Sequence, residues 1–95
     1  MSIDGKWRVR RLAGLLPPFG VTKRIAGGRG WTFFLGIPVG FFRVRGRRLE
    51  YVLWPVVDEV DPSPDGSWEG RARAGRWEFA RFRLTPLSLV STEDR

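Results

Sequence analysis

The sequence lacks cysteine and histidine altogether. Without these residues there is no disulfide, no thiolate nucleophile, no Ser–His relay and no common zinc, copper or haem ligand set. We therefore expect no cofactor. Only Asp, Glu, Lys, Arg and a single tyrosine, Tyr51, remain for acid–base or charge chemistry, and composition alone leaves open whether the protein is an enzyme.

Long apolar runs are missing too. No run approaches the roughly 18 to 20 residues that a membrane-spanning helix needs, and the first residues, Met-Ser-Ile-Asp-Gly-Lys-Trp, contain no apolar targeting segment. The chain also has no heptad pattern, helical repeat or low-complexity tract. We expect a soluble, cytoplasmic protein without a membrane span.

The size and composition fit one small globular domain. Ninety-five residues with 42% hydrophobic and 14% aromatic content are enough for a single core. The apolar pattern fades after Thr85, and the chain ends Ser-Thr-Glu-Asp-Arg. We expect one domain over residues 1–86 and a disordered tail over 87–95.

Positive charge is plentiful and uneven. The net charge is +7, and residues 1–50 hold eleven Lys or Arg against two acids, whereas residues 51–95 hold six against eight. The first half is thus about +9 and the second about −2 on the same count. A field of this kind favours anionic partners such as nucleic acid, acidic lipid or a carboxylate ligand.

Short alternating segments separated by tight turns predict an all-β protein. The central segment, residues 31–44, has five aromatic residues among its fourteen, with Gly36 near its midpoint, which indicates a hairpin. No stretch is typical of a helix. We predict a small antiparallel up-and-down β-barrel of about seven or eight short strands, because closing a meander removes its exposed edges.

Turn length fixes which residues share a face in a hairpin. A loop at Gly36-Ile37 would pair Trp31 with Phe42, and a loop at Gly46-Arg47 would pair Phe42 with Tyr51. The core face would then hold Trp31, Phe33, Leu35, Gly40, Phe42, Val44, Leu49, Tyr51 and Leu53. An apolar patch would remain outside on Phe34, Val39, Phe41, Val52 and Trp54. Such a patch predicts a homodimer through this sheet face.

A third hairpin follows a turn at Gly75-Arg76. It pairs Ala74 with Trp77, Ala72 with Phe79 and Gly70 with Arg81, so that small residues face large ones, as in a narrow barrel interior. This register turns Arg81 and Arg83 inward. Inward arginines must be paired, hydrogen-bonded or stacked on a ring, so Arg81 meets either barrel-closing groups or a ligand carboxylate.

The first strand opens with Gly5-Lys6-Trp7, and a long apolar loop, Gly14 to Gly20, follows it. In these features the chain resembles the calycin group of lipocalin-like binders. The resemblance implies a Trp at the closed end of the barrel, a late Arg, here Arg81 or Arg83, packed across it, and a lid formed by the loop. The chain is much shorter than lipocalins, so the resemblance implies a miniature with a small cavity.

The leading functional hypothesis is that the barrel binds an apolar or carboxylate-bearing small molecule inside, under the apolar loop. Asp58 and Glu59 adjoin an apolar run, so strand alternation must turn one of them inward. The candidate ligand-binding residues are Leu16, Phe19, Trp31, Phe33, Phe42, Tyr51, Asp58, Trp68, Phe79 and Arg81. We assign no catalytic or metal-binding residue.

Two other hypotheses stay open. A basic groove interleaved with aromatics is how small barrels hold single-stranded nucleic acid, and four arginines surround the turn at Gly46. Against it, the aromatics fall mostly on the inferred core face. The third hypothesis is a barrel cyclase or isomerase in which an acid such as Asp58 assists; an inward, unpaired carboxylate would favour it.

Overall fold

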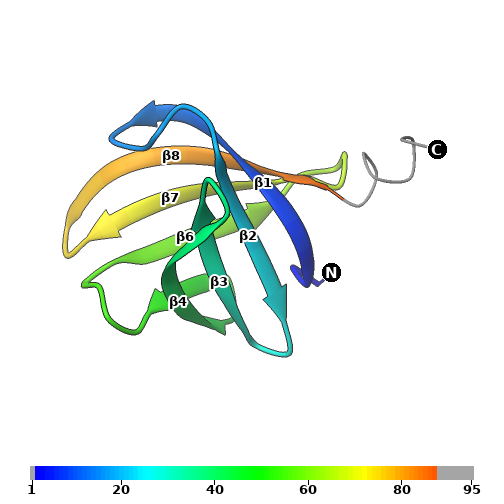
Figure 1. Cartoon of the computed structure of the whole chain (residues 1–95), viewed down its shortest axis with the longest axis horizontal. Coiled ribbons are helices and arrows are strands. Elements are labelled where there is room, and N and C mark those ends of the chain that lie inside the picture. Colours follow the sequence, from blue (N-terminus) through cyan, green and yellow to red (C-terminus); the bar gives the residue numbers. More distant parts are fainter. Residues whose placement is uncertain (1, 88–95) are drawn as a thin grey trace.

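The computed structural model describes residues 2–87, and it confirms the all-β barrel. Eight antiparallel strands follow one another in chain order and close into a barrel, because β1 also pairs with β8 (Figure 1). The described residues include no helix, and hence none that could cross a membrane. The strands are β1 (Gly5–Gly14), β2 (Val21–Ala26), β3 (Arg29–Phe34), β4 (Ile37–Arg45), β5 (Arg48–Tyr51), β6 (Val57–Pro62), β7 (Trp68–Ala74) and β8 (Trp77–Pro86).

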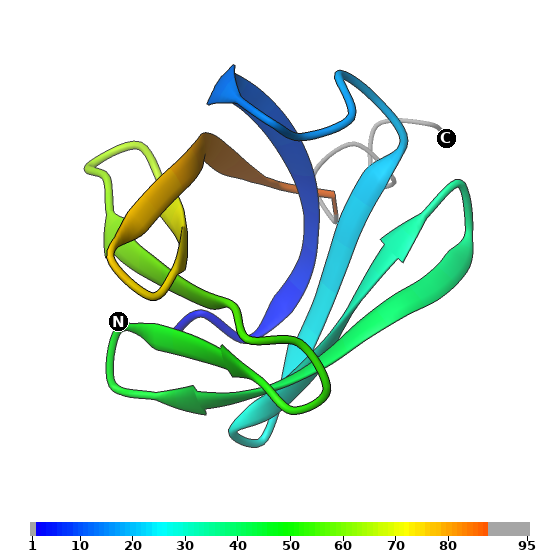
Figure 2. The same ribbon diagram turned by 90° about the vertical axis from the view of Figure 1, so that its left-hand side faces the viewer.

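The chain reverses direction at every connection, so alternate connections lie at opposite ends of the barrel. The connections β1–β2, β3–β4, β5–β6 and β7–β8 lie at one end, which we call the mouth, and Figure 2 shows all four around the opening. The other three connections and both ends of the described chain lie at the opposite, closed end (Figure 1). Loops of very different composition therefore gather at separate ends.

The predicted register of β4 and β5 is confirmed, with Phe42 opposite Tyr51 and Arg43 opposite Glu50. The register of β3 and β4 was wrong: Trp31 pairs with Phe41, not with Phe42. The turn is Leu35-Gly36, both with positive φ, at 52° and 82°, and opposite Thr32/Phe33 a bulge adds one residue, Val39, to β4. The shift turns Trp31 and Phe33 outward, so their predicted place on the core face is corrected.

The predicted register of the third hairpin, β7 with β8, is confirmed at its turn and wrong beyond the turn. Ala74 pairs with Trp77 as predicted, but a bulge at Ala72/Arg73 places Ala80 opposite Ala72 and Phe82 opposite Gly70. The extra residue reverses the facing of β8, because side chains alternate along a strand. The two arginines thus lie outside, where Arg81 binds Glu78 at 3.0 Å and Arg83 binds Glu69 at 3.4 Å.

Large rings fill the interior wherever a facing glycine leaves room. A Cβ on Gly70 would lie 2.3 Å from the Phe82 ring, and one on Gly40 would lie 2.7 Å from the Tyr51 ring. Both distances are shorter than a real contact, so the rings occupy the space that a side chain would need. The prediction that small residues face large ones is confirmed in kind, with different partners.

Apolar side chains plug the closed end. Ile3 is buried and accepts a hydrogen bond through its carbonyl from the Trp7 indole at 2.8 Å, and Trp68 is buried beside it. The late arginine that the calycin resemblance places across Trp7 is absent, because Arg81 and Arg83 point outward. Leu87 donates a backbone hydrogen bond to Lys6; the rest of the predicted tail, 88–95, lies outside the described residues.

Candidate functional site

Four polar side chains meet inside the barrel, and we call them the polar cluster: Lys23, Thr32, Tyr51 and Asp58. The Lys23 ammonium donates to Thr32 Oγ1 at 2.6 Å and to Tyr51 OH at 2.6 Å, and lies 3.3 Å from Asp58 Oδ2. Tyr51 OH also lies 2.6 Å from Thr32 Oγ1 and 3.4 Å from Asp58 Oδ2. Lys23 and Asp58 are each only 3% exposed, so all the donors of the ammonium are used within the cluster.

Strand alternation brings these residues together from four strands. Val21, Lys23 and Ile25 share the inner face of β2, and all three are buried. Tyr51 ends β5, and Asp58 lies on the inner face of β6, next to Ala72 of β7. The rings of Phe42, Tyr51 and Phe82 surround the ammonium at 5.2, 5.3 and 5.6 Å from their centres, which further stabilises its charge.

Burial and mutual contact alter the acid–base behaviour of the cluster. Burial acts to lower the pKa of Lys23, but the neighbouring Tyr51 and Asp58 outweigh it and hold that pKa above its ordinary 10.5. Burial raises the pKa of the Tyr51 phenol above 10.0, and it raises the pKa of the Asp58 carboxyl above 3.8 against the attraction of Lys23. The cluster as a whole holds its protons tightly.

A small cavity of about 80 Å³ connects the polar cluster with the mouth. Its floor is the polar cluster, and its upper wall is formed by Leu16 of the β1–β2 loop, Val56 of the β5–β6 loop and Phe79 of β8. The remaining wall is apolar and comprises Val9, Val21, Ala72 and Phe82. The site is therefore an apolar cavity with polar groups at its base.

Four of the ten residues predicted to bind a ligand line this cavity: Leu16, Tyr51, Asp58 and Phe79. Two others, Phe42 and Trp68, are buried but do not line it. Phe19 is 68% exposed on the loop, and Trp31, Phe33 and Arg81 lie on the outer face. Of the two acids that alternation was expected to divide, Asp58 is the inward one, and it is paired with Lys23.

Sequence reasoning missed Lys23 and Thr32. A signal was present for Lys23, because Val21-Thr22-Lys23-Arg24-Ile25 is a short strand whose apolar residues flank the lysine at spacing two. The chain also has fifteen arginines and only two lysines, so a lysine here is a departure from its general usage. Thr32 could not be placed, since its facing relative to Phe42 depends on the bulge between β3 and β4, where Val39 of β4 is the extra residue.

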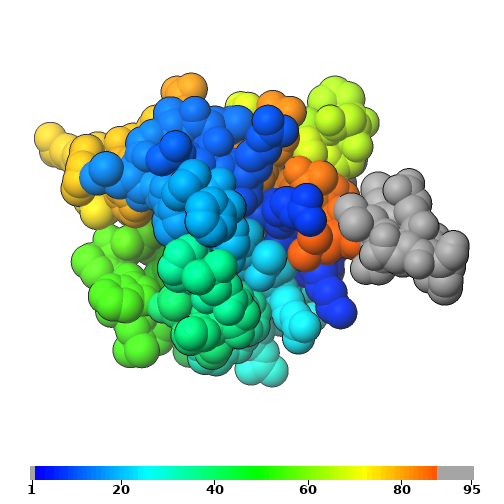
Figure 3. Space-filling model, turned by 45° about the horizontal axis from the view of Figure 1, so that its top comes forward, coloured from blue at the N-terminus to red at the C-terminus, as the bar shows by residue number. Residues whose placement is uncertain are grey.

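The mouth is surrounded by exposed apolar side chains from all four of its connections. Ten of the eleven large hydrophobic side chains that are exposed among the described residues lie in this half of the barrel; Trp31 is the exception. We call the following eight, which lie on or next to the connections, the apolar rim: Leu15, Phe19, Leu35, Ile37, Val52, Leu53, Trp54 and Trp77. Figure 3 shows the β1–β2 loop and the β3–β4 turn side by side, where Leu35 N donates to Gly20 O at 2.8 Å.

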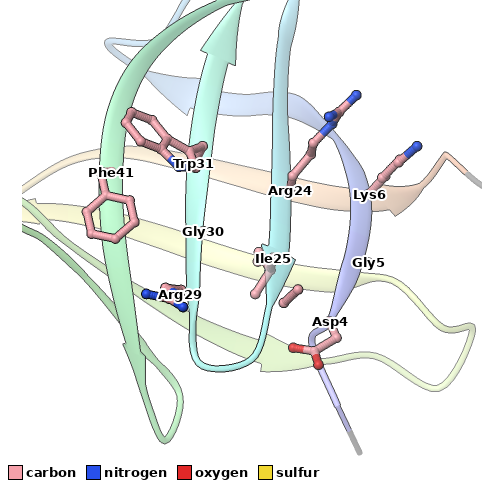
Figure 4. A pocket seen from close by; sticks show the side chains of 10 residues that line it. Asp4, Gly5, Lys6, Arg24, Ile25, Arg29, Gly30, Trp31 and Phe41 are labelled. Carbon is pink, nitrogen blue, oxygen red and sulfur yellow. The ribbon is translucent and has the colours of Figure 1, made fainter.

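The outer wall of β1 to β4 carries a second surface. Trp31 is 44% exposed and packs against Phe41 with ring centres 5.0 Å apart, and Arg24 lies over the Phe33 ring at 5.6 Å. Six cations of this wall have no acidic partner among the described residues: Lys6, Arg8, Arg10, Arg24, Arg29 and Arg43. A shallow hollow of about 730 Å³ lies here, beside Trp31, Phe41 and Arg29 (Figure 4).

Comparison with protein-family models, curated proteins and solved structures finds no match for this chain. Within residues 2–87 no group of three or more acidic side chains could hold a metal ion. The features that bear on function are the polar cluster, its cavity, the apolar rim and the outer wall.

Proposed function

We propose that the barrel binds a small molecule with an apolar body and one uncharged polar head, such as a hydroxyl or carbonyl group. The observation that carries the proposal is the polar cluster at the base of an apolar cavity that leads to the mouth. Burying a charged pair in so small a core costs several kcal/mol per ion in desolvation. A hydrophobic pocket with a few convergent polar groups of shifted pKa is the usual form of a ligand site.

The polar cluster favours a neutral head. Lys23 and Asp58 already neutralise each other at 3.3 Å, so a carboxylate entering the cavity would face Asp58 and lose its own hydration. A hydroxyl or carbonyl group brings no net charge and can exchange hydrogen bonds with Tyr51 and Thr32. The carboxylate-bearing ligand expected from the sequence depended on an inward Arg81, which lies outside.

The size of the cavity limits the ligand. About 80 Å³ is well below the roughly 300 to 1,000 Å³ of sites for drug-sized ligands. Leu16 lies on a loop and is only partly buried, so its displacement would extend the cavity toward the apolar rim. A short chain fits as the structure stands, and a longer one requires the β1–β2 loop to move.

A calycin kinship would be consistent with this function, since a closed barrel with Trp7 buried at its closed end and an apolar loop at its mouth matches what the resemblance implies. The missing arginine contact weighs against it. The cytoplasmic location expected from the sequence stays a prediction. The catalytic hypothesis lacks support, because it calls for an unpaired interior carboxylate and Asp58 is paired.

The test is calorimetric titration with linear alcohols from butanol to decanol. We expect saturable binding with a preferred chain length and a negative heat-capacity change, the mark of apolar burial. Val56→Trp fills the top of the cavity and should abolish binding. Val52→Trp, in the same loop but exposed and away from the cavity, should bind as the parent does. No heat with the parent protein, or equal binding by both variants, would reject the proposal.

A second candidate function is the binding of single-stranded nucleic acid on the outer wall of β1 to β4. The aromatics were expected to face inward, but Trp31 and Phe41 face outward among unpaired cations (Figure 4), and the Phe33 ring lies under Arg24. Exposed rings that stack on bases and cations that follow the phosphates are the two parts such a surface needs.

Fluorescence anisotropy of a labelled oligothymidine tests this candidate. Affinity should fall linearly with salt on logarithmic axes, and Trp31→Ala should weaken binding by about 1 to 3 kcal/mol, the contribution of one stacked base. Trp77→Ala, which removes an exposed tryptophan at the mouth (59% exposed, against 44% for Trp31), is the control. If salt dependence appears without any effect of Trp31→Ala, the surface attracts phosphates only and does not stack on bases.

A further inference from the structure

We propose that the mouth of the barrel docks on an anionic lipid bilayer, with the apolar rim inserted among the headgroups. This inference concerns a separate surface from the cavity and does not depend on whether the cavity is filled. It starts from the concentration of exposed apolar side chains at one end of the molecule. Soluble proteins seldom expose a contiguous apolar surface of this kind without a partner.

The shape of the apolar rim suits a bilayer. Its members stand on four loop tips that surround the opening (Figure 2), and they do not form a flat sheet face. The tips include Leu53, which is 84% exposed, and Trp54, which is 56% exposed. Tryptophan at such a tip is typical of a side chain placed at the level of lipid headgroups.

The β3–β4 turn also supports an apolar partner at the mouth. Leu35 adopts a φ of 52° while 61% exposed. This conformation is uncommon for a residue other than glycine and costs free energy. The strain places a leucine, not a polar turn residue, at the tip. A water-exposed turn would gain from Asn or Asp here, so the exposed leucine is explained best by an apolar partner.

The charges around the mouth decide which partner. Arg10 and Arg76 are exposed and have no acidic partner among the described residues, and Arg11 binds only the Leu16 carbonyl, at 3.3 Å. The acids of the same half, such as Glu59 and Glu78, are paired with arginines. A second copy docked mouth to mouth would bring like charges together, whereas an anionic bilayer complements them.

Vesicle co-sedimentation tests the proposal. The protein should bind vesicles of phosphatidylcholine and phosphatidylglycerol in equal amounts at least tenfold more tightly than vesicles of pure phosphatidylcholine, and salt should weaken the binding. The double variant Leu53→Glu, Trp54→Glu should lose at least tenfold in partition. Trp31→Glu, Phe41→Glu changes the net charge equally but lies on the outer wall, and it should retain binding.

Three results would overturn the inference. Failure of the parent protein to bind the anionic vesicles would do so directly. An equal loss in both double variants would mean that charge alone drives binding and that the apolar rim plays no part. Sedimentation velocity without lipid that shows a dimer dissociated by Leu53→Glu, Trp54→Glu would assign the apolar rim to a second copy of the chain. The alcohol titration is unaffected by any of these results, so the two proposals fail separately.

Discussion

Lys23 makes the most consequential contacts in the protein, because its ammonium joins β2 to β3, β5 and β6 in the middle of the core. Its four-carbon stem reaches from the strand to the cluster, and its three donors meet Thr32, Tyr51 and Asp58. Arginine has a planar fork of five donors and would leave several of them unpaired in the same space. This explains why a chain that otherwise uses arginine has a lysine here.

The Lys23–Asp58 pair gives a prediction that tests its contribution to stability separately from its role in ligand binding. Lys23→Met leaves Asp58 buried without a partner and should lower the free energy of unfolding by about 3 to 5 kcal/mol. Adding Asp58→Leu removes the stranded charge and should restore most of that loss, as for other buried pairs replaced by apolar residues. Chemical denaturation measures both. The double variant should fold but no longer bind alcohols; binding equal to the parent's would contradict a ligand-binding role of the cluster.

Tyr51 supplies a pH prediction with its own spectroscopic signal, since it is the only tyrosine. The fold raises the pKa of Tyr51 above 10.0 and that of Lys23 above 10.5. Both groups hold their protons more tightly folded than unfolded, so their stabilisation is complete below about pH 10 and is lost as pH rises through the folded values. Tyrosinate absorbance should appear only above pH 10, together with loss of structure. Ionisation at or below pH 10 in the folded protein would contradict the burial of Tyr51.

At the scale of single elements, the sequence predicted two of the three hairpin turns correctly, but none of the bulges. The turn at Gly46-Arg47 was correct because one opposite-charge pair, Arg43 with Glu50, and one aromatic pair, Phe42 with Tyr51, agree on one register. The β3–β4 turn was wrong because glycine was expected to start it, whereas Leu35 accepts a strained φ and packs against Gly20.

The bulges account for the other errors. A bulge cannot be recognised from the alternation of apolar and polar residues. It depends on how the strand pairs with its neighbour, because that pairing accommodates the extra residue. The bulge at Ala72/Arg73 reversed β8 and took Arg81 out of the predicted site, and the bulge at Thr32/Phe33 did the same for Trp31. Tyr51 and Asp58, which lie on strands with no bulge in their pairing with either neighbour, were predicted correctly, as was Leu16 of the β1–β2 loop. Phe79 was also predicted, although it is the extra residue of the β8 bulge and its register was wrong.

The β7–β8 register makes an element-scale prediction. Gly70→Ala places a methyl group 2.3 Å from the Phe82 ring, which is only 2% exposed and cannot move freely. We expect a loss of about 1 to 3 kcal/mol, the usual cost of overpacking, measured by thermal or urea unfolding. Gly70→Ala with Phe82→Leu should recover part of the loss. A neutral Gly70→Ala would favour the sequence-based pairing of Gly70 with Arg81 instead.

The whole molecule separates its paired charges, its unpaired cations and its exposed apolar side chains onto different surfaces. Acidic side chains neutralise the arginines of β5 to β8, while the outward-facing cations of β1 to β3 have no acidic partner among the described residues, and the exposed apolar side chains gather at the mouth. The uneven charge was readable from the sequence. The gathering at the mouth was not, because it depends on a meander that brings four distant loops to one end.

The predicted homodimer remains untested at this scale. Of its five patch residues, Val39, Val52 and Trp54 are exposed and Phe41 lies on the outer wall, but Phe34 packs against the core. The patch shares Val52 and Trp54 with the apolar rim, so the predicted homodimer and the proposed lipid docking depend on some of the same side chains. The vesicle and sedimentation experiments above distinguish the two.

Nuclear magnetic resonance of the protein labelled with nitrogen-15 in lysine only tests whether the barrel interior is a ligand site with the polar cluster at its base. The chain has two lysines. The exposed ammonium of Lys6 exchanges its protons with water too fast to be seen at neutral pH, whereas that of Lys23, buried and bonded to three side chains, should give one protected signal. Adding a linear alcohol should shift that signal in the parent protein and leave it unmoved in Val56→Trp. Absence of a protected ammonium signal, or a signal that no alcohol shifts, would contradict the account.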